Sequence, residues 1–129
     1  MRILVDTQCW LWIASAPERL SARARALVEA TERELFLSAA SAWEIAIKHA
    51  LGKLRLPEAP ADYVPSRLDA LRMKPLAIEH AHALRVSGLP HHHRDPFDRL
   101  LVAQAQIDGL SILTADRVFA AYDVPTIDA

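Results

Sequence analysis

The chain has 129 residues, 52% of them hydrophobic, so it can bury one domain-sized core. Its formal net charge of −1 excludes a global positive field, so any polyanionic partner would have to be met locally. The single cysteine, Cys9, excludes an internal disulfide and favours a reducing, cytoplasmic setting, and no stretch resembles a signal peptide or reaches the roughly 20 apolar residues of a membrane span.

Short apolar runs alternate with amphipathic segments in the first part of the chain. Residues 2–5 (RILV) are typical of a buried strand, and residues 7–15 continue in a helical pattern. Residues 20–33 predict an amphipathic helix, residues 34–38 (ELFLS) a second strand, and residues 41–53 a helix that closes at a glycine.

The middle of the chain has a less regular pattern. Residues 56–65 contain three prolines and are expected to form a connector or the start of a helix, and residues 66–72 look helical. Residues 74–78 (KPLAI) are expected to form a short strand or an extended link, and residues 79–89 a short helix. The histidine-rich stretch 91–94 is expected to be a loop.

The last segments return to a clear pattern. Residues 96–109 predict a helix, residues 110–115 (LSILTA) a third buried strand, residues 116–124 a short helix, and residues 125–128 an edge strand. Because strands and helices alternate, the sequence predicts a single α/β domain over residues 1–129, with a parallel sheet covered on both faces. Ligands of such domains bind beyond the carboxyl ends of the strands.

Acidic residues follow the predicted strands. Asp6 directly follows the first strand, Glu44 lies in the first turn of the next predicted helix, and Asp116 follows the third strand. Asp95 and Asp98 begin the helix that leads into that third strand. Carboxyl ends of parallel strands share one edge, so these acids are predicted to converge there. Clustered carboxylates repel one another unless a cation is present, and hard oxygen ligands suit Mg²⁺ or Mn²⁺.

Each acid also has a structural interpretation as a helix cap. Ser41 and Glu44 have the spacing of a capping box, and Asp95 before a proline is typical of an N-cap. Asp98 would be favoured in a first helical turn by the helix dipole, and the other two acids precede predicted helices. Capping explains each position singly, but it does not explain why an acid rather than Ser or Asn stands at all of them.

Three histidines, His91, His92 and His93, stand beside the acids. Consecutive histidines point in different directions and do not easily ligate one ion. A solvated loop, with phosphate contact when protonated, is the expected use. The stretch HHHRDPFDRLL is therefore predicted to contribute to a metal site through its aspartates.

Aromatic and basic side chains near the acids have two interpretations. Trp10, Trp12 and Trp43 could stack on bases, but they stand among core-like residues, which favours packing or a dimer contact. Lys48, four residues after Glu44, either pairs with it along the helix or meets phosphate at the rim of the cleft. The other basic residues with these alternatives are Arg94, Arg99 and Arg117.

Small polar residues lie at the ends of the predicted strands. Thr7, Ser38 and Thr114 could orient a carboxylate or a water, or could simply bond to the backbone. Cys9 is expected to be a small buried residue, because nothing near it in sequence supplies a catalytic base.

In this order, these segments resemble the PIN-domain family, and specifically the VapC-type toxins of toxin–antitoxin pairs. The stretch ILVDTQCWLW is similar to the family's opening strand and first acid, and LSAASAWEIAIKHALGKL to its second strand and glutamate segment. The most distinctive match is HHHRDPFDRLLVAQAQIDGLSILTAD, with its D-P-F-D-R start and T-x-D end. The resemblance covers essentially the whole chain.

The resemblance implies a PIN-like α/β fold and an endoribonuclease that hydrolyses RNA phosphodiesters with Mg²⁺ or Mn²⁺. It assigns four acids to the catalytic metal site, namely Asp6, Glu44, Asp98 and Asp116. Asp95 would be a possible further ligand, a neighbour of the ligands or only a cap. The resemblance also implies a homodimer and a cognate antitoxin that blocks the site.

Two other functions remain open from the residues. One is another metal-dependent phosphohydrolase, such as a DNA nuclease or a phosphatase, although DTQCW lacks the D-x-D start of the aspartyl-phosphate phosphatases. The other is a non-catalytic module that holds a basic partner peptide in the acidic cleft.

Overall fold

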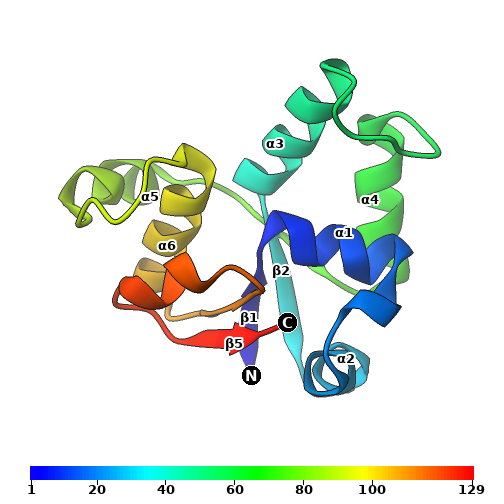
Figure 1. Ribbon diagram of the computed structural model, residues 1–129, viewed down its shortest axis with the longest axis horizontal. Helices are drawn as coiled ribbons and strands as arrows, with labels where there is room; N and C mark the ends of the chain where they lie inside the picture. Colours follow the sequence, from blue (N-terminus) through cyan, green and yellow to red (C-terminus); the bar gives the residue numbers. More distant parts are fainter.

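Five short strands form one central sheet in the computed structural model, which describes residues 1–129. Helices surround the sheet (Figure 1). The strands pair in the order β3-β2-β1-β4-β5, and every neighbouring pair is parallel. The strands are β1 (Arg2–Val5), β2 (Glu34–Ser38), β3 (Lys74–Leu76), β4 (Ser111–Thr114) and β5 (Thr126–Asp128). The predicted α/β fold with a parallel sheet is confirmed.

Helices cover both faces of this sheet (Figure 1). The α-helices are α1 (Thr7–Ser15), α2 (Ala22–Glu29), α3 (Ala39–Ala50), α4 (Pro60–Ala70), α5 (His80–Arg85) and α6 (Pro96–Asp108). Three short 3-10 helices are η1 (Pro17–Arg19), η2 (Val86–Gly88) and η3 (Arg117–Ala121). None of the helices has the length and apolar character needed to cross a bilayer.

Several helix boundaries differ from the sequence prediction. Helix α3 begins at Ala39 because Ser38 is its N-cap, with the Ser38 hydroxyl accepting a hydrogen bond from the Ala40 amide at 3.0 Å. The capping-box interpretation of Ser41 and Glu44 is therefore wrong. Helix α2 ends four residues before the predicted end at residue 33, and the short helix predicted over residues 116–124 is 3-10 rather than α.

The core is divided into two clusters by the sheet. Alternate side chains of β1 point to opposite faces, so Ile3 and Val5 join one cluster and Leu4 joins the other. The first cluster packs against α1, α2, α3 and α4, and it includes the fully buried Trp10. The second packs against α6 and η3. Burial on both faces explains why the strands are apolar throughout instead of alternating with polar residues.

The strand order fixes where a ligand can bind. From the central strand β1, the sheet continues through β2 and β3 on one side and through β4 and β5 on the other. The direction of winding therefore reverses between β1 and β4, and a crevice opens at such a switch point beyond the carboxyl ends of the strands. Helix α6 runs back against the strands before β4, so its N-terminus reaches the same edge.

Candidate functional site

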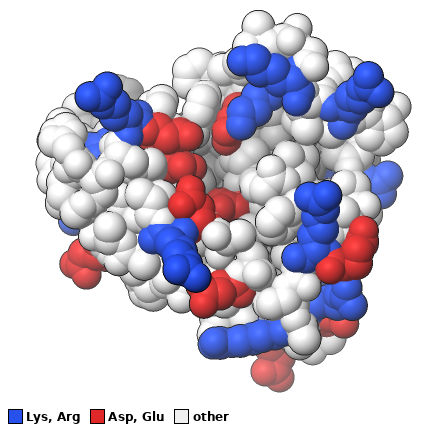
Figure 2. Space-filling view, in the orientation of Figure 1, with Lys and Arg blue, Asp and Glu red and all other residues white.

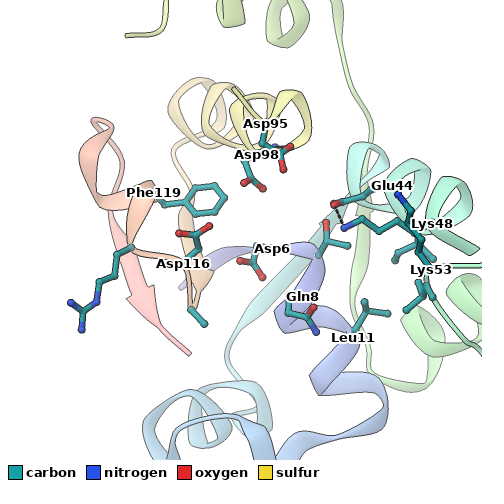
Figure 3. A pocket seen from close by; sticks show the side chains of 15 residues that line it. Asp6, Gln8, Leu11, Glu44, Lys48, Lys53, Asp95, Asp98, Asp116 and Phe119 are labelled. Atoms are coloured by element: carbon teal, nitrogen blue, oxygen red, sulfur yellow. Dashed lines mark hydrogen bonds and ion pairs between the residues drawn. The ribbon is translucent and has the colours of Figure 1, made fainter. Parts of the chain in front are cut away.

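A cleft of about 770 Å³ opens at this edge of the sheet, and its lining is rich in carboxylates (Figure 3). In the space-filling view, acidic side chains gather around a central hollow, with lysine and arginine side chains on the surrounding surface (Figure 2). The acids that line the cleft are Asp6, Glu44, Asp95, Asp98 and Asp116. The structure therefore brings together all five acids that the sequence analysis singled out.

Asp6 is fixed between the ends of β1 and β4. As the N-cap of α1 it accepts a hydrogen bond from the Cys9 amide at 2.8 Å, and its second oxygen accepts one from the Thr114 hydroxyl. Thr114 also accepts a hydrogen bond from the Asp116 amide at 2.9 Å. Burial raises the pKa of Asp6; the hydrogen bonds from Thr114 and Cys9 oppose this effect, and the charge of Asp116 adds to it.

Asp98 carries the largest electrostatic penalty among the acids. It lies in the first turn of α6 and faces the cleft (Figure 3). Burial, followed by the charges of nearby acids, raises its pKa to about 7. The charges that contribute belong to Asp95, Glu44, Asp6 and Asp116. Four carboxylates, three of them from distant parts of the chain, thus act on one side chain.

Basic residues compensate this negative charge only in part. Lys48 pairs with Glu44 at 2.7 Å, and this hydrogen bond, together with the charges of Glu44, Asp95 and Asp98, raises the pKa of the lysine against the opposing effect of burial. Its side chain remains half exposed and lines the cleft, so the two interpretations of Lys48 are compatible. The lining of the cleft contains five acids but only three basic residues, which are Lys48, Lys53 and Arg117.

The chemistry of these donors fits a hard divalent cation. Carboxylate oxygens are the ligands that Mg²⁺ and Mn²⁺ prefer, and a cation would relieve the repulsion at Asp98. The present side-chain geometry is not that of a formed coordination sphere, because no group of three or more His, Cys, Asp or Glu residues is arranged to hold a metal ion. Lys48 occupies one oxygen of Glu44, so ion binding there would require this ion pair to open. Thr114 contacts Asp6, and His93 contacts Asp98, through one carboxylate oxygen only, Oδ2 in each case.

Two expectations about the neighbouring residues need correction. Arg99 is 6% exposed and donates its hydrogen bonds to backbone carbonyls and to Tyr122, so it neither contacts an acid nor is free to bind phosphate. His93 is half-buried and contacts Asp98, which no spacing rule in the sequence indicated. His91 and His92 are exposed, as expected for the loop.

The three tryptophans have different environments. Trp10 is fully buried, and Trp12 packs partly buried against the same core cluster. Trp43 is 61% exposed, and its ring meets Phe97 edge-on with centroids 5.5 Å apart. Packing therefore accounts for the first two tryptophans but not for Trp43.

The small polar residues at the strand ends have different hydrogen-bonding roles. Thr114 orients the Asp6 carboxylate, Ser38 caps a helix, and Thr7 donates to the buried Ser41 hydroxyl at 2.9 Å. Cys9 is buried, as expected.

Fold and site together define an α/β domain with an acidic, candidate metal-binding cleft at the switch point of its parallel sheet. The model of the PIN domain matches residues 3–125. The chain therefore belongs to the PIN domain family.

Similar proteins add detail to this assignment. A segment of 68 residues, 51% of this chain, is 50% identical to ribonuclease VapC16 from Mycobacterium tuberculosis, and it spans 48% of that protein, about half its length. Solved structures with the same fold include VapBC2 from Rickettsia felis bound to a promoter DNA fragment, with a TM-score of 0.74, 12% identity and coverage of 99% of this chain and 98% of the other. DNA-bound VapBC from Salmonella typhimurium aligns with a TM-score of 0.68, 15% identity and coverage of 99% and 98%.

Proposed function

We propose that this chain is a divalent-metal-dependent endoribonuclease, the toxin of a type II toxin–antitoxin pair. The observation that carries the proposal is the convergence of five carboxylates, from four separate parts of the sequence, in one cleft. The segment that is 50% identical to a protein named ribonuclease VapC16 supports RNA as the substrate class. The solved VapBC complexes with the same fold support an antitoxin as partner.

Four side chains would hold the cation, namely Asp6, Glu44, Asp98 and Asp116. When bound, Mg²⁺ or Mn²⁺ would supply Lewis-acid stabilisation of the phosphate and acidify a water for attack on phosphorus. The chain itself fixes the ligands: Thr114 holds the Asp6 carboxylate and the Asp116 backbone in one hydrogen-bonded unit.

The rim of the cleft can meet a polyanion despite its acidic floor. Lys48 and Lys53 line it, and the ammonium of Lys48 already has a carboxylate partner in Glu44. A phosphate that approaches this rim would gain a charge-assisted hydrogen bond. These lysines supply positive charge locally, which a polyanion needs because the net charge of −1 provides no global positive field.

Substitution of the acids tests the proposal. Asp6→Asn and Asp98→Asn keep the shape of the side chain but remove its charge, and we expect each to lower Mn²⁺-dependent RNA cleavage by at least about 100-fold, since loss of a mere outer partner of a metal ligand costs about 10–100-fold. The matched control is Asp69→Asn, an exposed aspartate of α4 outside the cleft. Full activity of a purified, folded Asp6→Asn protein, or cleavage by the wild type that persists in EDTA, would contradict the assignment.

The competing enzymatic functions are tested in the same assay. An RNA and a DNA strand of the same sequence separate a ribonuclease from a DNA nuclease, and a phosphomonoester separates both from a phosphatase. The ion pair of Lys48 with Glu44 places an ammonium group in the cleft, and this supports occupation by a basic antitoxin side chain or, in a non-catalytic module, by a basic peptide. We further propose a homodimer in the cytoplasm, the compartment that suits the free Cys9.

A further inference from the structure

A line of hydrogen bonds leads from the interior to Asp98. It begins at Arg99, whose buried guanidinium donates to the carbonyl oxygens of Pro90 at 2.7 Å and Val86 at 3.1 Å. The same guanidinium donates to the phenolic oxygen of Tyr122 at 3.1 Å. These contacts fix the arginine without any acidic partner.

The line continues through two side chains to the cleft. The Tyr122 hydroxyl lies 2.7 Å from Nδ1 of His93, and Nε2 of His93 lies 3.3 Å from Oδ2 of Asp98. The ring of His93 also packs against Phe119, which lines the cleft, with centroids 6.4 Å apart. A half-buried histidine therefore bridges the interior and a candidate metal ligand.

The chemistry of these groups fixes which one donates and which one accepts in each hydrogen bond between Arg99 and Asp98. A guanidinium can only donate, so the oxygen of Tyr122 accepts from Arg99 and its own proton is available for Nδ1 of His93. With Nδ1 as acceptor, the proton of neutral His93 resides on Nε2 and points at the Asp98 carboxylate. The opposite tautomer would set the nitrogen lone pair against an oxygen of the ionised Asp98 carboxylate.

We propose that Arg99, Tyr122 and His93 form a relay that orients the Asp98 carboxylate for metal binding, with His93 as the positioning residue. The metal part of this inference rests on the proposed function. Groups that hydrogen-bond to metal ligands fix their orientation, and their loss commonly weakens metal binding about 10–100-fold. Tyr122 follows η3, which Asp116 caps, so the relay also ties Asp116 and Asp98 to each other through the fold.

Two readouts test the relay in the folded, full-length chain. In the metal-free protein with Asp98 ionised, ¹⁵N NMR of the imidazole should show His93 as the Nε2–H tautomer. Tyr122→Phe should weaken this preference, because it removes the donor to Nδ1 and leaves only the Asp98 contact. By calorimetry, His93→Phe should weaken Mn²⁺ binding by about tenfold or more, while His93→Gln, whose amide can still donate to Asp98, should recover part of the loss. His92→Phe is the matched control, because the His92 ring packs on the same Tyr122 but has no hydrogen bond to Asp98.

The outcomes separate this inference from the proposed function. A His93 with its proton on Nδ1, or Mn²⁺ affinity in His93→Phe within twofold of the wild type, would overturn the relay. If Mn²⁺ binding depends on His93 as expected but no RNA is cleaved, the relay stands and the ribonuclease proposal fails. If the wild type binds no Mn²⁺, the metal proposal fails and the tautomer alone decides whether the hydrogen bonds run as described. Amide spectra of each variant check that it is folded.

Discussion

Individual acids in this chain combine two roles that the sequence presents as alternatives. Asp6 and Asp116 each accept a backbone amide as the N-cap of a following helix, and both line the cleft. Asp98 is not a cap, but it stands in the first turn of α6. Capping uses one carboxylate oxygen and leaves the second for other partners, so a cap and a ligand can be the same residue.

Asp98 should make the metal-free protein less stable at higher pH. Its pKa is raised from 3.8 to about 7, so between these values the folded state binds the proton more tightly than the unfolded state. The free energy of unfolding therefore falls as the pH rises through this range. Asp98→Asn removes the penalty and should be more stable than the wild type at about pH 8, by roughly 0.5–2 kcal/mol. Urea unfolding at about pH 5 and pH 8 measures the difference, which should shrink at the lower pH.

The sign of the stability difference between wild type and Asp98→Asn is the decisive part of this prediction. A wild type that equals or exceeds the stability of Asp98→Asn at about pH 8 in EDTA would show that Asp98 is not repelled by its neighbours. Saturating Mn²⁺ supplies the internal comparison, because a bound cation should reverse the order of the two proteins.

Helix α6 is the element that carries the most functional information. Asp95 caps it, accepting the amides of Phe97 at 2.9 Å and Asp98 at 3.2 Å, and Pro96 occupies its first position. Its end is set by Gly109 at φ +67°, a left-handed conformation that favours glycine. These are local interactions, so both ends of this helix are predictable from sequence. The start of α3 was not, because two serines competed for its cap and Ser41 became buried against Thr7.

The role of Asp95 can be separated into cap and charge. Asp95→Asn keeps an N-cap acceptor, whereas Asp95→Ala removes it and should lower the free energy of unfolding by about 1 kcal/mol. Because the other four acids form the proposed metal site, we expect Asp95→Asn to retain RNA cleavage within about tenfold of the wild type. Denaturation and cleavage assays on both variants check this. A loss in Asp95→Asn as large as in Asp98→Asn would make Asp95 a metal ligand instead.

At the scale of the whole molecule, the acidic cleft brings the ends of two neighbouring strands together with two helices from other parts of the chain. Asp6 belongs to the β1 end, Glu44 to α3, Asp98 to α6 and Asp116 to the β4 end. Their mutual repulsion opposes the folded arrangement of the cleft. A cation in the cleft would convert this repulsion into attraction.

Divalent cations should therefore stabilise the entire fold. An ion that binds only the folded state at 100 times its Kd adds about 2.7 kcal/mol to the free energy of unfolding, which raises the Tm by several degrees. Thermal melts with Mn²⁺ or Mg²⁺, against NaCl of the same ionic strength, measure the effect. Asp6→Asn should lose most of the increase, and an equal increase in both proteins would place the ion outside the cleft.

The sequence by itself determined the alternation of strands and helices, the parallel sheet and the position of each acid relative to its strand. These features depend on the spacing of apolar residues and on hydrogen bonds between near neighbours, both of which are written locally in the chain. Only the tertiary structure decided that Arg99 is buried, that Trp43 is exposed, and that His93 lies between Tyr122 and Asp98. The contact of His93 with Tyr122 joins residues 29 positions apart, and its existence depends on how η3 packs against α6, which no local pattern encodes.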